Sequence, residues 1–164
     1  VVCTRIDDDD KQERLKSVQQ IVQEYEEALK GCGIRIGTYT GKKEDKEKSE
    51  RTMQAFKAGE IDILIATTVI EVGVNVPNAT AIVIVNADQF GLATLHQLRG
   101  RVGRGRFQSF CVFESGEMTE EGRQRLDVMC RTTNGFEIAK EDLQIRGVGD
   151  FVVHVSLGVT DICR

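Results

Sequence analysis

Two apolar runs set the architecture of this chain: Ile61-Asp62-Ile63-Leu64-Ile65-Ala66 and Ala79-Thr80-Ala81-Ile82-Val83-Ile84-Val85. Each run has the length of a single strand and is rich in the β-branched residues that strands favour. Beyond Asp62 and Thr80 every residue in them is apolar. Continuous apolar strands are typical of a parallel sheet that helices cover on both faces. The two runs therefore predict an α/β fold with a mostly parallel sheet.

The segments around these runs supply the other elements. Apolar residues recur at spacings of three and four over 11–30, which predicts a helix that ends at Gly31-Cys32-Gly33. A very polar helix is predicted over 44–58, with Met53 and Phe56 as its apolar anchors. The remaining predictions are strands at 1–3, 34–40 and 109–113 and consecutive helices at 119–131 and 135–145. Two helices without a strand between them indicate a helical appendage after residue 115.

Composition limits the classes of function. The 164 residues carry a formal net charge of −4 and include five cysteines, and the pI is about 5.3. Stand-alone nucleic-acid binders usually have a basic domain. The cysteines form no C-x-x-C pair, and the acidic run 7–10 lacks the Gly and Glu of a calcium loop, so no metal site is expected. No leader peptide and no membrane span is recognisable, and we expect reduced thiols.

The stretch Gln97-Leu98-Arg99-Gly100-Arg101-Val102-Gly103-Arg104-Gly105-Arg106 carries the clearest chemistry. On a helix, Leu95, Leu98 and Val102 lie on one side, and Gln97, Arg101 and Arg104 gather on the other. Guanidinium groups stay charged and match phosphate oxygens bidentately, so a nucleotide phosphate is their natural target. On these residues alone, a solvated basic helix end remains equally consistent.

Three neighbours fall outside this phosphate-facing group. Arg99 and Arg106 lie off its face and are assigned to the surface. His96 adjoins Gln97 but points elsewhere on the helix, so we assign it to helix packing or to the surface.

The rest of a nucleotide site is absent from the sequence. A P-loop needs G-x-x-x-x-G-K-[ST], whose backbone N–H groups cradle phosphates. The nearest match, residues 37–43, has the wrong spacing and no hydroxyl after the lysine. No acidic magnesium box follows a strand. The arginines therefore suit a site that another lobe completes.

A second stretch, residues 66–78, begins where an apolar strand ends, and ligands of open α/β sheets bind at such carboxyl ends. Thr67 and Thr68 offer hydroxyl and N–H groups to phosphates. Gly73 allows close backbone approach, and Asn75 can hydrogen-bond a ribose hydroxyl. By itself, the pattern also fits a strand, a turn and a structural glycine.

Together the two stretches resemble the fifth and sixth signature motifs of the superfamily 2 helicases. The sequence most resembles that of the RecG-like ATP-dependent DNA helicases. The likeness rests on residues 63–105 (ILIATTVIEVGVNVPNATAIVIVNADQFGLATLHQLRGRVGRG), 108–113 (QSFCVF), 132–147 (TTNGFEIAKEDLQIRG) and 149–151 (GDF). Upstream, residues 38–64 fit the family's helix–strand lead-in to the fifth motif. The resemblance covers residues 1–151.

The resemblance implies a RecA-like three-layer fold. Residues 1–115 would be the second RecA-like helicase lobe. Residues 116–164 would be a helical appendage like the RecG translocation element, divergent after 151. It also implies a substrate of branched or forked DNA, and ATP with Mg²⁺ held mainly by a first lobe that is absent here. Such a motor remodels DNA in recombination, repair and replication-fork rescue, in a bacterial-type cytoplasm or an organelle of bacterial descent.

The family's functional positions carry over residue by residue. Arg104 matches the arginine finger on the γ-phosphate, and Arg101 matches a second phosphate contact. The resemblance assigns nucleotide contacts to Gly73, Asn75 and Gln97, and contacts with the DNA backbone to Thr40, Gly41, Thr67 and Thr68.

Two departures from the family keep alternatives open. Asn75 stands where relatives most often have Asp, and after Phe151 the family's Gly-Thr-Arg-Gln-Ser-Gly pattern is missing. One alternative is a double-stranded DNA translocase of the transcription-repair coupling type. The other is a non-catalytic truncated lobe that acts as a binding module.

Overall fold

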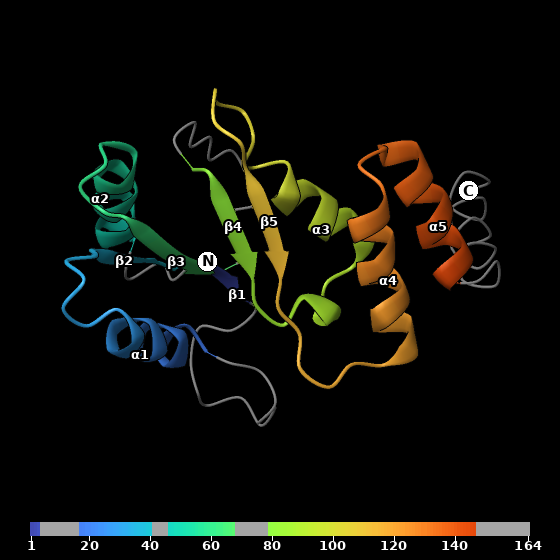
Figure 1. Cartoon of the computed structure of the whole chain (residues 1–164), viewed down its shortest axis with the longest axis horizontal. Coiled ribbons are helices and arrows are strands. Elements are labelled where there is room, and N and C mark those ends of the chain that lie inside the picture. Colours follow the sequence, from blue (N-terminus) through green and yellow to red (C-terminus); the bar gives the residue numbers. More distant parts are fainter. Residues whose placement is uncertain (4–16, 41–45, 68–78, 147–164) are drawn as a thin grey trace, which may run out of the picture.

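A parallel sheet forms the centre of the molecule. The computed structural model of the protein describes residues 1–3, 17–40, 46–67 and 79–146. Within these ranges the five strands lie in the order β2-β3-β1-β4-β5, and all neighbouring strands are parallel (Figure 1). The strands are β1 (Val2–Cys3), β2 (Ile36–Tyr39), β3 (Ile63–Thr67), β4 (Ala81–Ile84) and β5 (Phe110–Phe113). The predicted α/β fold with a parallel sheet is confirmed.

Helices connect the strands and continue beyond the last one. They are α1 (Val18–Ala28), α2 (Lys46–Lys57), α3 (Leu92–Arg99), α4 (Glu120–Arg131), α5 (Gly135–Arg146) and the short 3-10 helix η3 (Ala87–Gln89). In the part of the chain that the structure describes, none of them combines the length and apolarity that crossing a membrane requires.

The central strand β1 contributes side chains to two separate cores, because successive side chains of a strand point to opposite faces. Val2 belongs to a buried cluster with Ile84 and the leucines of α3. Cys3 belongs to a second cluster with Ile65 and with Ile21 of α1. Both faces of the sheet are therefore covered, as the unbroken apolar strands predicted.

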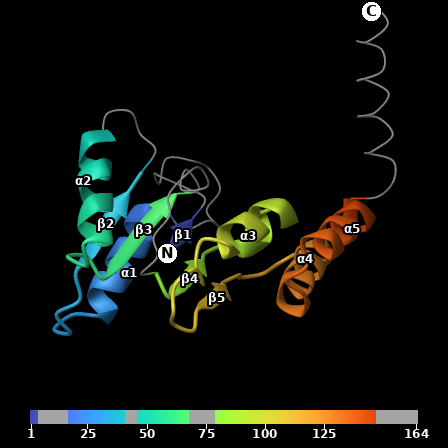
Figure 2. The same cartoon turned by 90° about the horizontal axis from the view of Figure 1, so that it is seen from above.

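The handedness of the connections decides which helix covers which face. The steps from β2 to β3 and from β4 to β5 run in one direction across the sheet, whereas the step from β1 to β2 runs in the other. Right-handed crossovers then place α2 and α3 on one face and α1 on the opposite face. Figures 1 and 2 agree with this arrangement, with α1 on the other side of the strands from α2.

Helix α1 begins later than its apolar periodicity predicted. Ser17 is its N-cap in extended conformation, and its side chain accepts a hydrogen bond from the backbone N–H of Gln20. The Gln20 side chain accepts one from the Ser17 N–H in return, which completes a capping box. A continuous helix over 11–30 is therefore wrong, because the extended backbone of Ser17 interrupts it, and residues 11–16 lie outside the described residues.

Helices α4 and α5 confirm the two consecutive helices predicted after the sheet. Leu126 and Met129 of α4 and Ile138 of α5 belong to the same buried cluster as the leucines of α3. Arg125 of α4 also donates to the backbone oxygen of Asp88, at 2.9 Å, next to the end of β4. The two helices thus share a core with the sheet (Figure 2).

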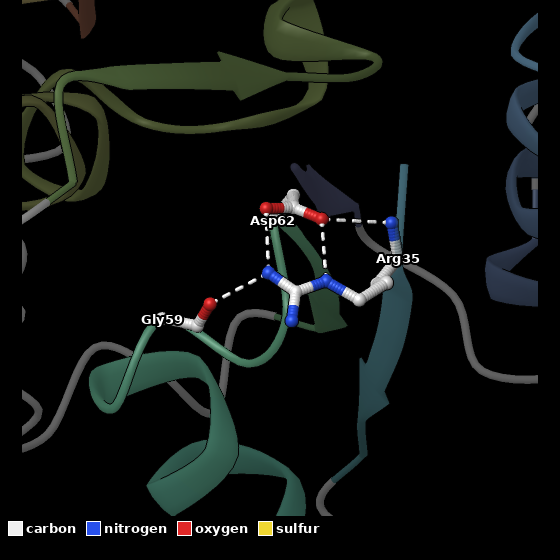
Figure 3. A network of polar contacts seen from close by, with 3 residues as sticks. All are labelled: Arg35, Gly59 and Asp62. Carbon is white, nitrogen blue, oxygen red and sulfur yellow. Dashed lines mark hydrogen bonds and ion pairs between the residues drawn. The ribbon is translucent and has the colours of Figure 1, made fainter. Parts of the chain in front are cut away.

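A polar clamp holds the amino ends of β2 and β3 together (Figure 3). The Arg35 guanidinium makes two bonds to the Asp62 carboxylate, at 2.9 and 3.0 Å, and one to the Gly59 carbonyl oxygen at 2.6 Å. The Arg35 backbone N–H donates to the same carboxylate at 2.9 Å. These bonds to Arg35 lower the pKa of Asp62 from 3.8 to about 2.

The clamp predicts a specific loss of stability in acid. Because folding lowers the pKa of Asp62, its contribution is fully present above about pH 4 and is lost as the pH falls toward 2. Asp62→Asn should lower the melting temperature at pH 7, and the gap from wild type should narrow between pH 4 and pH 2. Thermal unfolding followed by circular dichroism measures this gap. Glu50→Gln, at an exposed carboxylate on α2, is the control, and a gap independent of pH would contradict the assignment.

Candidate functional site

Helix α3 ends earlier within the arginine stretch than predicted. Helix α3 ends at Arg99, and Gly103 has a φ of 82°, in the left-handed region that does not continue a helix. Gln97 remains on α3 with an exposed side chain, but Arg101 and Arg104 lie beyond its end. The prediction that these three side chains share one helical face is therefore wrong. The glycines of the stretch explain this, because they favour helix ends over helix interiors.

The apolar side of the stretch is as predicted. Leu95 and Leu98 are 0% exposed, and the half-buried Val102 packs against the same core. Leu92, at the start of α3, is also fully buried. The helix is therefore fixed on the sheet up to the point where the two candidate phosphate-binding arginines begin.

Arg101 is half-buried and lines a pocket of about 480 Å³. Met53 and Phe56 of α2 line the same pocket, together with residues 79–81, where β4 begins. Arg101 thus lies near the amino ends of the strands, between α3 and α2, with part of its surface removed from water.

Arg104 is exposed and held from one side. Its Nε donates to the backbone oxygen of Gly100 at 3.0 Å, at the C-terminal end of α3. The partial negative charge of a helix C-terminus favours a cation there. The tether orients the guanidinium while its terminal nitrogens can meet two oxygens of a phosphate. The structure thus gives Arg104 the exposure that a ligand held on another lobe would require.

Arg99 is a structural residue, and its assignment to the surface is wrong. Its Nη1 donates to the backbone oxygens of Met129, at 2.7 Å, and Thr132, at 2.8 Å. Thr132 is the C-cap of α4, so the guanidinium satisfies carbonyls that the helix itself leaves without partners. No sequence signal pointed to these bonds, because the partners lie some thirty residues away along the chain.

His96 has the packing role expected for it. Its Nδ1 lies 3.1 Å from Nη2 of Arg99. A Cβ atom on Gly135, at the start of α5, would lie 3.4 Å from its Nε2. His96 and Arg99 therefore join the end of α3 to the α4–α5 connection.

Thr40 and Thr67, two of the predicted DNA contacts, lie at the carboxyl ends of neighbouring strands. Ser49 of α2 fixes Thr40, since its hydroxyl donates to the Thr40 backbone oxygen at 3.1 Å. Thr67 is only 2% exposed, and its hydroxyl has no hydrogen-bond partner among the residues that the structure describes. Its contact with DNA stays a prediction, and in this conformation its hydroxyl does not face solvent.

The predicted site residues therefore separate into two groups. Thr40 and Thr67 lie at the carboxyl edge of the sheet, whereas Arg101 lies near the amino ends of the strands. The structure does not bring the threonines and the arginines together. The other predicted contacts, Gly41, Thr68, Gly73 and Asn75, lie outside the described residues.

Cysteine chemistry adds no second site. Among the described residues, none of Cys3, Cys32, Cys111 and Cys130 forms a disulfide, and burial raises the pKa of Cys111 to about 11. A thiol with a raised pKa is a poor nucleophile at neutral pH. Over the described ranges, no group of three or more His, Cys, Asp or Glu residues could hold a metal ion.

Comparisons with known proteins identify relatives of the chain. The family model described as the helicase conserved C-terminal domain matches residues 5–106. Over 162 residues the chain is 48% identical to the ATP-dependent DNA helicase RecG of Staphylococcus aureus and 47% identical to that of Staphylococcus epidermidis. These matches cover 98% of this chain and 23% of each relative, so the chain spans about a quarter of their length.

Solved structures agree with this result. The structure of RecG bound to a three-way DNA junction aligns with a TM-score of 0.65 and 43% identity, over 80% of this chain and 18% of that one. The yeast DEAD-box splicing factor Prp28 aligns with a TM-score of 0.57 and 22% identity, over 74% of this chain and 27% of that one. At that identity the second match supports the fold alone.

The bonds of Arg99 predict a loss of stability on truncation. Arg99→Ala leaves two carbonyl oxygens near the C-cap of α4 without a charged donor, which costs roughly 1.5–3 kcal/mol of unfolding free energy. Urea unfolding measures the loss. Arg106→Ala, at an exposed position, should stay within about 0.5 kcal/mol of wild type. Equal effects of the two substitutions would show that the Arg99 bonds contribute nothing.

Proposed function

We propose that this chain, which belongs to the helicase conserved C-terminal domain family, is the second motor lobe of a RecG-type ATP-dependent DNA helicase. The observation that carries the proposal is 48% identity to RecG over nearly the whole chain, including the arginine stretch and the two helices after the sheet. Its proposed substrate is branched DNA, because the RecG of the aligned structure is bound to a three-way junction. Residues 1–115 form the lobe, and residues 116–164 form its helical appendage.

The geometry of the arginines supports a role in ATP hydrolysis. Phosphoryl transfer depends mostly on positioning and on stabilising charge on the phosphate oxygens. Arg104, exposed and tethered by Gly100, is the arginine finger, and Arg101 is the second phosphate contact. Gln97, exposed on α3 one turn before Arg101, responds to the nucleotide.

The nucleotide itself is held mainly by a first lobe. In the relatives, more than three quarters of the length lies outside the matched segment, which leaves room for such a lobe. ATP bound to the first lobe with Mg²⁺ supplies the energy, and Gly73 and Asn75 of this chain complete the contacts with the nucleotide.

DNA contacts are assigned to the opposite edge of the sheet. Thr40, Gly41, Thr67 and Thr68 follow the carboxyl ends of β2 and β3, which are adjacent strands. Backbone N–H groups at such an edge suit the phosphates of a DNA backbone, and a contact through the buried hydroxyl of Thr67 requires a change of conformation. Because this edge of the sheet lies apart from the arginines, the lobe can contact DNA and ATP simultaneously.

The two alternatives receive less support. The relatives named above are RecG helicases, which favours this function over a translocase of the transcription-repair coupling type. A non-catalytic binding module would not need an exposed arginine tethered at a helix end. We place the work of the protein in a bacterial cytoplasm, since DNA is the proposed substrate and these relatives come from Staphylococcus.

The arginine-finger assignment is tested in a joined motor, in which this chain replaces the matching segment of Staphylococcus aureus RecG. Arg104→Ala should lower the DNA-stimulated turnover of ATP by roughly 10³-fold or more, because the finger stabilises charge in the transition state. Steady-state ATPase assays with a saturating three-way junction measure this. Arg123→Ala, an exposed arginine of α4, is the matched control and should leave turnover within about twofold. Unchanged turnover in Arg104→Ala would refute the assignment.

The acidic charge of the chain predicts weak binding of DNA in isolation. With a net charge of −4, the isolated chain neutralises few phosphates, so the logarithm of its affinity should change little with the logarithm of salt concentration. Fluorescence anisotropy with a labelled three-way junction at several salt concentrations gives both quantities. Tight binding at physiological salt by the chain alone would contradict the division of labour between two lobes.

A further inference from the structure

The loop between α3 and β5 contains an exposed aromatic residue as well as arginines. This loop, residues 103–109, lies between the end of α3 and the start of β5 (Figure 1), and we call it the arginine–phenylalanine loop. Its two ends approach each other, since a Cβ atom on Gly103 would lie 3.7 Å from Cβ of Ser109. The Ser109 hydroxyl donates to the Phe107 backbone oxygen at 3.3 Å. The loop is therefore closed at its base and presents its tip to solvent.

One exposed aromatic ring lies in the loop, and a second directly follows it. Phe107 is 76% exposed, and Phe110, the first residue of β5, is 57% exposed. Arg104 and Arg106 lie in the same loop and are exposed as well. A single exposed apolar side chain is ordinary, but two rings with two guanidiniums in seven residues form a distinct chemical group.

Rings and guanidiniums together match the two parts of a nucleotide. Guanidiniums bind phosphate oxygens bidentately, and an aromatic face stacks on any base.

We propose that the arginine–phenylalanine loop recognises a whole nucleotide, with Phe107 stacking on its base while Arg104 meets its phosphate. This rests on the proposed function of Arg104 and adds a base contact to it. The nucleotide is the ATP of the motor, whose phosphate Arg104 contacts in the proposed function. Phe110, which follows the C-terminal end of the loop, extends the apolar surface beneath the nucleobase.

The test distinguishes contacts with the nucleobase from contacts with the phosphates. In the joined motor, Phe107→Ala removes the ring, Phe107→Trp keeps a stacking face, and Phe136→Ala removes an even more exposed ring on α5 as the control. For each variant, kcat and KM for ATP, the inhibition constant of inorganic tripolyphosphate, and the junction concentration for half-maximal stimulation are measured. Tripolyphosphate has no base, so its binding reports on the phosphate contacts alone.

The expected result is a selective loss of base binding. Phe107→Ala should raise KM for ATP about tenfold with little change in kcat, as expected for a lost stacking contact. Phe107→Trp should restore KM, and tripolyphosphate inhibition should not change. If instead only the half-stimulating junction concentration rises, the ring contacts a base of the DNA strand, and the assignment to ATP is wrong.

Two further outcomes would overturn the proposal. The first is a Phe107→Ala variant indistinguishable from Phe136→Ala in all of these quantities. The second is an equal weakening of ATP and tripolyphosphate, which would mean that the substitution disturbs the arginines rather than removing a base contact. Failure of the arginine-finger assignment is distinguishable, because it appears as unchanged kcat in Arg104→Ala.

Discussion

The burial of helix α3 against the sheet is the constraint on which the rest of this lobe depends. Leu92, Leu95 and Leu98 are 0% exposed and pack with side chains of β1 and β4. Burying a leucine fully contributes about 1.5–3 kcal/mol, so the three together fix the helix firmly. The two candidate phosphate-binding arginines, Arg101 and Arg104, follow the last of these leucines within a few residues. Apolar packing therefore fixes the helix end from which both arginines extend.

The same helix ties the lobe to the two helices that follow the sheet. Arg99 donates to two carbonyl oxygens near the end of α4, and His96 packs against the start of α5. Helices α4 and α5 also add apolar side chains to the core around α3. A movement of α3 and the arginines would therefore move the appended helices as well. In the proposed motor, this contact gives nucleotide binding a direct mechanical path to the appendage.

Much of the fold was readable from the sequence because its strongest signals are local. Unbroken apolar runs predicted the buried parallel strands, and spacings of three and four predicted the helices. The start of α1 was misjudged because apolar periodicity was given more weight than the capping box of Ser17 and Gln20, which is itself a sequence signal. The end of α3 was misjudged similarly, since the helical face was extended through Gly100 and Gly103.

The candidate site was less readable because its geometry depends on distant partners. The residue types suited to phosphate were identified, but nothing near Arg99 indicates that it bonds to Met129 and Thr132. Likewise, the pattern at the end of β3 offered Thr67 as a hydroxyl donor, whereas packing leaves it 2% exposed. Sequence reasoning supplies the chemistry of a side chain, and tertiary packing decides whether that chemistry faces a ligand.

The charge distribution explains why such a lobe works as a partner. A net charge of −4 disfavours the approach of a polyanion from a distance, whereas Arg104 attracts a phosphate only near contact. Such a surface is poorly suited to capturing ATP from solution but well suited to closing on ATP that another lobe already holds. In the proposed motor, catalysis requires the two lobes to meet, because the Arg104 guanidinium would stabilise the transition state only after closure. Hydrolysis is thereby coupled to the relative position of the lobes, which is the coupling that a translocating motor needs.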